Sequence, residues 1–181
     1  MDEAALQRRI GYELREPGLL RQALTHRSAG AENNERLEFL GDGALNFCIA
    51  RWLFETFPRE QEGVLSRLRA RLVCTETLAA IAEELELGRL VYLGPGERKA
   101  GGHRRESILA DALEAVIGAV LRDGGVEAME GVVHRLWESR VSELDPRLVT
   151  KDPKTRLQEL LQAAGRPLPD YQLVDAAGAE H

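Results

Sequence analysis

Hydrophobic residues along this 181-residue chain recur with the spacing of helices almost throughout. Apolar side chains stand three and four positions apart, and no segment before residue 145 alternates polar and apolar residues as a half-buried strand would. Two segments, residues 35–57 and 105–123, are strongly apolar, which is typical of helices packed inside a fold. The pattern therefore predicts an all-α domain. Its other helices would be one or two short ones before residue 24, one opening at Glu62–Gly63, one near Thr75–Thr77 and one after Gly124–Gly125.

Local signals predict where these helices begin and end. Asn33 or Asn34 is the expected N-cap of the helix over residues 35–57, because Asn accepts hydrogen bonds from the first turn, and Pro58 is expected to end it. Thr75 or Thr77 is expected to cap a later helix. The remaining boundaries are a break near Pro17–Gly18, a stop at Gly88 and a Gly/Pro-rich loop over residues 93–102.

The last part of the chain has a different pattern. Residues 146–152 contain Pro146 and mixed charges and are expected to form a linker. A short amphipathic helix over residues 154–164 is expected next, with Pro153 at its start, and residues 171–174 have the composition of one strand. One helix and one strand cannot bury a core. We therefore divide the chain into a helical domain (1–145), a linker (146–152) and part of a larger α/β module (153–181).

Composition limits the classes of protein to which the chain can belong. It is 44% hydrophobic and 30% charged, as soluble globular proteins are, and it has no apolar run long enough to cross a bilayer. The acidic N-terminus lacks the basic-then-apolar order of a signal peptide, so no membrane and a cytoplasmic location are expected. Cys48 and Cys74 are expected to be small core residues and not a disulfide. The net charge of −6 argues mildly against nucleic-acid binding, but the basic residues are clustered.

The candidate chemistry lies in the two most apolar helices. Glu35, Glu38 and Asp42 stand three and four residues apart and share one helical face, and Asp111 and Glu114 stand three apart in the second helix. If the helices pack together, four carboxylates can converge from two rigid elements. Oxygen-only ligand sets suit Mg²⁺ or Mn²⁺ and not zinc, and such clusters can polarise a phosphodiester. Spacing alone is also compatible with solvated surface acids.

The segment Asn34–Asp42, NERLEFLGD, resembles the signature of the ribonuclease III family, endonucleases that cut double-stranded RNA. Further segments resemble other motifs of the family in the expected order, and the resemblance extends over about residues 5–145. Asp152–Glu159 looks like the opening of a double-stranded-RNA-binding domain. The resemblance therefore implies an all-α nuclease domain followed by a truncated α/β RNA-binding domain. The additional matching segments are Leu24–Ser28, Glu62–Arg69, Gly94–Glu97 and Arg105–Asp111.

The resemblance also implies roles for particular residues. Glu38, Asp42, Asp111 and Glu114 would be the metal ligands, for Mg²⁺ with Mn²⁺ as a substitute. Among other candidates, Glu35 and Glu62 would lie near the scissile strands, as catalytic or groove-shaping acids, or would be simple helix-start and loop acids. Phe39 would contact the second subunit of a homodimer or, equally, belong to the core, and His26 would form structural hydrogen bonds and not act as a general base.

Basic and polar residues are candidates for RNA contacts. Arginines beside a carboxylate site would bind the phosphates that flank the cut. In the C-terminal piece, one helix face and the segment at His181 would enter minor grooves, where duplex RNA is recognised by shape and 2′-hydroxyls. The candidates are Arg67, Arg69, Arg104, Arg105, Thr155, Gln158, Glu159, Gln162 and His181.

The implied function is that of a homodimeric, Mg²⁺-dependent endoribonuclease acting on double-stranded RNA. It would leave 5′-phosphate and 3′-hydroxyl ends and process ribosomal RNA precursors and messenger RNA. One alternative is a non-catalytic module that binds duplex RNA with the same fold, which the retention of all six acids disfavours. Another is an all-α phosphohydrolase for nucleotides or isoprenoid diphosphates, which the RNA-binding motif at residues 152–159 disfavours.

Overall fold

A computed structural model describes residues 2–148 and 153–169 of the chain. The chain divides into two compact units, residues 1–146 and 147–181. The described residues of the first unit form helices and turns, and an isolated parallel bridge between Thr25 and Tyr92 is their single strand-like pairing. The prediction of an all-α domain is confirmed for this unit. Its helices are α1 (Glu3–Ile10), α2 (Pro17–Ala23), α3 (Glu35–Thr56), α4 (Glu62–Leu72), α5 (Thr75–Glu84), α6 (Pro95–Lys99) and α7 (Glu106–Ser142), with short 3₁₀ turns η1 (Leu87–Arg89) and η2 (Gly102–Arg104).

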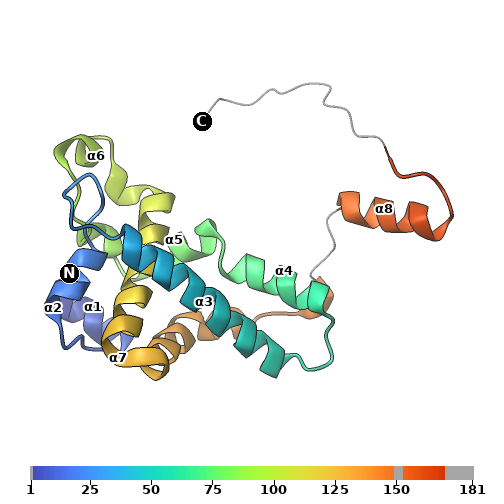
Figure 1. Cartoon of the computed structure of the whole chain (residues 1–181), viewed down its shortest axis with the longest axis horizontal. Coiled ribbons are helices and arrows are strands. Elements are labelled where there is room, and N and C mark those ends of the chain that lie inside the picture. The colour runs from blue at the N-terminus through green and yellow to red at the C-terminus, as the bar shows by residue number, and fades with distance from the viewer. Residues whose placement is uncertain (1, 149–152, 170–181) are drawn as a thin grey trace. The chain divides into compact units, whose positions relative to one another are not determined.

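The two strongly apolar helices form the centre of this unit. α3 packs most extensively against α7, α5 and α2 also pack on α7, and α4 packs on α3 (Figure 1). Leu45 and Ile49 of α3 and Leu113 and Ile117 of α7 are completely buried. Removing one such side chain from water contributes roughly 1.5–3 kcal/mol. The hydrophobic burial that stabilises the domain therefore also fixes α3 against α7.

The long helix α7 changes direction at Gly125. This glycine has φ 79° and ψ −172°, a backbone conformation that few other residues adopt, so the segment is two helices joined at the predicted break. Just before the kink, the Asp123 carboxylate accepts hydrogen bonds from the Tyr12 hydroxyl (2.7 Å) and from the N–H groups of Arg15 (2.9 Å) and Glu16 (3.0 Å). These bonds fasten the α1–α2 connection to α7.

Some predicted helix boundaries are confirmed and others are wrong. α3 begins after Asn34, and the Asn33 side chain accepts the N–H of Glu35 at 3.1 Å. The cap predicted at Thr75 or Thr77 is wrong, because Cys74 is the N-cap of α5 and both threonines lie inside the helix. The Thr77 hydroxyl instead donates to the carbonyl of Arg71 at 2.8 Å, which satisfies the end of α4.

The errors at glycine and proline have local causes. Pro17 is the first residue of α2, a position that proline tolerates well, and α1 already ends at Ile10, with Gly11 as its C-cap. α5 ends at Glu84, and Gly88 lies inside η1. The loop predicted over residues 93–102 contains α6, which is five residues long. Cys48 is buried as predicted, whereas Cys74 is partly exposed, and both are free thiols.

Trp137 connects α7 to α4. Its side chain is completely buried, and its indole N–H donates to the carbonyl oxygen of Leu72 at 2.9 Å. Leu72 is the last residue of α4, where backbone carbonyls have no partner within the helix. One aromatic residue thus fills the core and satisfies a helix end.

Within the second unit, α8 (Pro153–Ala163) begins with Pro153 as predicted, and Gly165 (φ 63°) follows it. The 3₁₀ turn η3 (Pro146–Leu148) lies at the division between the units. The strand predicted over residues 171–174 and the RNA contact predicted at His181 lie outside the described residues. The truncated RNA-binding domain therefore stays a prediction. Among the described residues, no helix has the length and apolarity needed to cross a membrane.

Candidate active site

The candidate site lies where α3 and α7 approach each other through their backbones. A Cβ atom added to Gly41 of α3 would lie 1.8 Å from the carbonyl oxygen of Glu114, and one added to Gly118 of α7 would lie 2.1 Å from that of Leu37. Ordinary contacts to a Cβ begin near 3.4 Å, so no other residue fits at either position without movement of a helix. This close approach lets acids on the two helices face each other.

Three of the predicted metal ligands meet at this crossing. One carboxylate oxygen from each of Glu38, Asp111 and Glu114 lies within 4.8 Å of the other two, and all three side chains are half-buried. Three ionised carboxylates so close together repel one another unless a cation or a proton compensates them. The set contains only oxygen ligands, which suits a hard divalent cation such as Mg²⁺ or Mn²⁺. The residues present therefore fit the metal that the sequence implies.

The carboxyl pKa values reflect this crowding. Burial raises the pKa of Glu114 to about 7, and the charges of Asp42, Asp111 and Glu38 contribute to the rise. Burial also raises the pKa of Glu38 and of Asp111, while the positive charge of Arg27 opposes both shifts. Near neutral pH, Glu114 therefore carries a proton in a large fraction of metal-free molecules. A bound cation would favour its ionised form.

Asp42, the fourth predicted ligand, lies at the edge of this cluster. It is exposed on α3 and does not belong to the group of three, although its charge acts on both Glu38 and Glu114. Asn46 lies one helical turn after Asp42, and its side-chain amide donates a hydrogen bond to Asp42 Oδ1 at 2.8 Å. Asp42 therefore lies beside the three converging acids without being one of them.

A cavity of about 570 Å³ opens beside the cluster. Glu38 and Asp111 line its acidic wall, and Arg27 and Arg105 contribute positive charge. Arg105 pairs with Glu97 at 3.0 Å, and Arg27 pairs with Glu35 at 3.7 Å. Acids able to hold a cation and arginines able to pair with phosphate therefore line one opening.

The structure separates the two remaining predicted acids. Glu35 lines the acid cavity, beside Glu38. Glu62 opens α4, accepts a hydrogen bond from the Ser66 hydroxyl at 2.7 Å and lines a different, largely apolar cavity of about 370 Å³. Within one chain, Glu62 is therefore not brought to the metal cluster.

The residues predicted to contact RNA also lie at different places on the molecule. Arg105 lines the acid cavity, and Arg104 is exposed on η2. Arg67 and Arg69 lie on α4, away from that lining, and Arg69 borders the same cavity as Glu62. In α8, Gln158 is half-buried and Gln162 is exposed, whereas the side chains of Thr155 and Glu159 lie outside the part that the structure describes.

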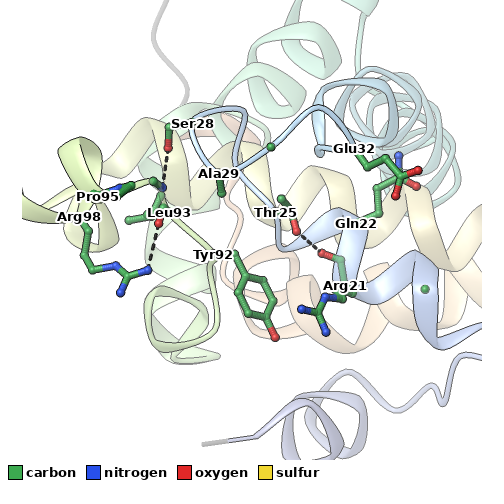
Figure 2. A pocket seen from close by; sticks show the side chains of 13 residues that line it. Arg21, Gln22, Thr25, Ser28, Ala29, Glu32, Tyr92, Leu93, Pro95 and Arg98 are labelled. Atoms are coloured by element: carbon green, nitrogen blue, oxygen red, sulfur yellow. Dashed lines mark hydrogen bonds between the residues drawn. The ribbon is translucent and has the colours of Figure 1, made fainter.

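A second cavity of about 570 Å³ adjoins the first (Figure 2). It lies between α2 and the segment from Tyr92 to Arg98, and the Arg21 guanidinium stands 5.2 Å from the centre of the Tyr92 ring. Ser28 lines both cavities. The segment that carries Ser28 is therefore a shared wall between the acid cavity and its neighbour.

Several residues of the acid cavity had no catalytic or binding role assigned from the sequence. Arg27, Ser28, Asn34 and Glu97 all line it. Each lies in a segment that resembles a family motif, so the motifs were a usable signal. Only the folded chain brings Glu97 next to Arg105, because the Gly-rich segment between them turns back on itself.

The exposure of Phe39 decides between its two predicted roles. Its side chain is 83% exposed, so the alternative of a core aromatic is wrong. Phe47 (57%) and Phe54 (71%) are also exposed on α3, at spacings that place all three aromatic rings along one side of the helix. A row of exposed aromatic side chains is typical of a surface that another protein covers.

Fold and site together define an all-helical domain with a cluster of acids suited to a divalent cation. A family model described as Ribonuclease-III-like matches residues 16–139. The chain is 57% identical to Ribonuclease 3 of Methylococcus capsulatus and 60% identical to that of Nitrosococcus oceani, over 97% of the chain and 76% of each relative. The chain belongs to the ribonuclease III family.

Solved structures support the same conclusion. The nuclease domain of ribonuclease III from Campylobacter jejuni is 41% identical and superposes with a TM-score of 0.76, over 80% of this chain and 99% of that domain. Another structure of that domain concerns flexibility in a region involved in dimer formation. Dicer from Pichia stipitis, at 22% identity and a TM-score of 0.59, shares the fold.

Proposed function

We propose that this chain hydrolyses phosphodiester bonds in double-stranded RNA at a metal centre formed by Glu38, Asp42, Asp111 and Glu114. Its membership of the ribonuclease III family makes it a double-strand-specific endoribonuclease. The observation that carries the residue assignment is the convergence of Glu38, Asp111 and Glu114, each offering an oxygen within 4.8 Å of the others. Two helices fixed by backbone contact support this geometry.

Mg²⁺ is the proposed cofactor, with Mn²⁺ as a substitute. Divalent ions at such a centre neutralise phosphate charge and generate a nucleophile from water at neutral pH. The chain supplies the rest: the carboxylates hold the ions, and the rigid helix crossing keeps them in position. Arg27 and Arg105 bind the phosphates next to the scissile one, after exchanging their present partners Glu35 and Glu97 for RNA.

The proposed active form is a homodimer. The exposed Phe39 of one subunit would enter the apolar cavity of the other, which Leu53, Phe54 and Leu65 line. Twofold symmetry would repeat the contact, since one surface supplies both the aromatic ring and the cavity. Glu62 borders that cavity, and Glu38 directly precedes Phe39 in the sequence. Each dimer contact would therefore bring Glu62 of one subunit close to Glu38 of the other. Glu62 would then serve the site of the opposite subunit.

Two sites in one dimer would cut opposite strands of the duplex. The products would carry 5′-phosphate and 3′-hydroxyl ends with short 3′ overhangs. We propose structured RNAs of the cytoplasm as substrates, specifically ribosomal RNA precursors and messenger RNA. The C-terminal piece would add duplex contacts through Thr155, Gln158, Glu159, Gln162 and His181.

The decisive assay incubates the chain with long double-stranded RNA, in the presence of either Mg²⁺ or EDTA, and sizes the products. We expect reduction to short duplexes only with the metal. Glu114→Gln is the matched variant, because it keeps the shape of the side chain and removes a ligand charge. Normal cleavage by this variant would refute the metal assignment.

Two controls separate the alternatives. A chain that shifts duplex RNA on a native gel but never cuts it would be a binding module. A chain that hydrolyses mononucleotides or isoprenoid diphosphates in preference to duplex RNA would be a different phosphohydrolase. Membership of the ribonuclease III family favours duplex RNA over either small molecule.

A further inference from the structure

His26 lies in the wall of the acid cavity, on the connection between α2 and α3. Asp111, one of the proposed metal ligands, lines the same cavity. Neither the metal assignment nor the arginine contacts give this residue a task. Its hydrogen bonds determine what it can do.

Ser28 fixes the tautomer of this ring. The backbone N–H of Ser28 points to His26 Nδ1 at 3.2 Å, and the Ser28 hydroxyl oxygen lies 2.8 Å from the same nitrogen. A backbone N–H can only donate, so Nδ1 must accept. The Ser28 oxygen itself accepts the N–H of Gly94 at 3.0 Å, which leaves its own proton available for Nδ1 (Figure 2). The neutral ring therefore carries its proton on Nε2.

The backbone around this pair is held on both sides. The N–H of His26 donates to the carbonyl of Tyr92 at 3.0 Å, and the N–H of Tyr92 donates to the carbonyl of Leu24 at 2.8 Å. Gly94 packs so closely against the Ser28 carbonyl that an added Cβ would overlap it. The ring is consequently oriented before any substrate arrives, as an effective binding group must be.

The Nε2–H group has no hydrogen-bond partner among the residues that the structure describes. It belongs to a ring in the wall of a cavity that receives RNA under the function proposed above. A general base would need an unprotonated Nε2, which the bonds at Nδ1 disfavour. A non-bridging phosphate oxygen can only accept hydrogen bonds, and so it complements a group that can only donate.

We propose that His26 Nε2–H donates a hydrogen bond to a phosphate oxygen of the RNA strand bound at the acid cluster, and that Ser28 is the positioning residue that fixes this donor. This inference rests on the proposed nuclease function. It assigns a substrate contact to the Leu24–Ser28 motif, and it couples that contact to the segment at Gly94 through one hydroxyl group.

Two substitutions of one residue test the assignment. Asn places an oxygen near the position of Nδ1 and has no donor at Nε2, whereas Gln reaches the position of Nε2 with an N–H. His26→Asn should lower kcat/KM about 10- to 100-fold, the effect expected for one hydrogen bond to a charged group. His26→Gln should restore most of this loss. Ser28→Ala, which only loosens the ring, should have a smaller effect than His26→Asn.

A binding measurement separates this contact from effects on chemistry. In a Glu114→Gln background, which cannot cut, the affinity for a short RNA duplex should fall with His26→Asn and recover with His26→Gln. The melting temperatures of all variants should stay near that of the parent, which shows that the fold is intact. The pH dependence of cleavage should be the same for His26→Gln and for wild type.

Each contrary result has a distinct meaning. If wild type fails to cut duplex RNA with Mg²⁺, the proposed function is refuted. If wild type cuts and both variants match it, His26 makes no useful contact. If Gln is as inactive as Asn and the pH profile changes, His26 is an acid or base. If a 2′-deoxy substitution at the cleavage site abolishes the difference between wild type and His26→Asn, the accepting oxygen belongs to the 2′-hydroxyl and not to the phosphate.

Discussion

Replacing Gly118 by alanine should move the two halves of the active site apart. Gly118 lies four residues after Glu114 on α7, and an added Cβ would stand 2.1 Å from the carbonyl oxygen of Leu37 on α3. A backbone oxygen cannot rotate out of the way as a side chain can. The helices must therefore separate locally to accept a single methyl group.

The size of the effect follows from this overlap. To extend the distance from 2.1 Å to the ordinary 3.4 Å, α3 and α7 must separate by about 1.3 Å. Overpacking of a core costs typically about 1–3 kcal/mol, and the cost should be at the upper end here because backbone is displaced. The higher helix propensity of alanine offsets about 1 kcal/mol of this loss in folding free energy. We expect a net loss of about 2 kcal/mol, or a decrease in Tm of about 4–8 °C.

The displacement should affect cleavage more than it affects stability. Glu38 lies one residue after Leu37, so a shift of α3 changes its distance from Asp111 and Glu114. Misplacement by about 1 Å can lower a reaction rate about 100-fold. Thermal denaturation and initial cleavage rates, measured well below the Tm of the variant, report the two effects separately.

Gly131→Ala is the matched control on the same helix. It lies in the second part of α7, and an added Cβ would meet nothing within 4 Å. This variant should gain about 0.5–1 kcal/mol in stability and keep its activity. If Gly118→Ala proved as stable and as active as Gly131→Ala, the backbone contact between α3 and α7 would not set the site geometry.

Three further predictions concern the acids and the dimer. Because the folded-state pKa of Glu114 is raised to about 7 from 4.5, metal-free protein should lose stability as pH rises from about 4.5 to 7, and Glu114→Gln should flatten this fall in denaturation with EDTA. Mg²⁺ should raise the Tm near neutral pH, by the equivalent of about 2.7 kcal/mol at a hundred times its Kd, and an equal rise in Glu114→Gln would place the ion elsewhere. Phe39→Ala should sediment as a monomer at concentrations where wild type is dimeric, whereas an unchanged dimer would exclude the aromatic row as the interface.

Hydrophobic periodicity predicted the helical domain well because the central elements are long. α3 and α7 bury residues on several faces, and such helices can be recognised without knowledge of their partners. The local ends were less predictable. Thr77 is a residue type that often caps helices, but its hydroxyl donates a hydrogen bond to a carbonyl of the preceding helix. This contact cannot be inferred from the spacing of apolar residues.

The candidate site was predictable only where family motifs marked it. The i, i+3 spacing puts Asp111 and Glu114 on one face, but their meeting with Glu38 depends on two glycines that let backbones touch. Neither Gly41 nor Gly118 has a chemical group that signals this role. The tautomer of His26 depends on a backbone N–H and on a bond from Gly94, 68 residues away in the chain, and so only the folded structure specifies it.

The buried indole of Trp137 gives the domain an internal optical reporter. Its N–H bond to Leu72 closes α4 against α7, and so its emission should shift to longer wavelength when these helices separate and water reaches the ring. The other tryptophan, Trp52, stacks on the partly exposed side of the domain against His134, with ring centres 3.9 Å apart. Replacing Trp52 by phenylalanine would leave one fluorophore. Rapid dilution of unfolded protein out of denaturant could then follow the docking of α4 during folding without any added label.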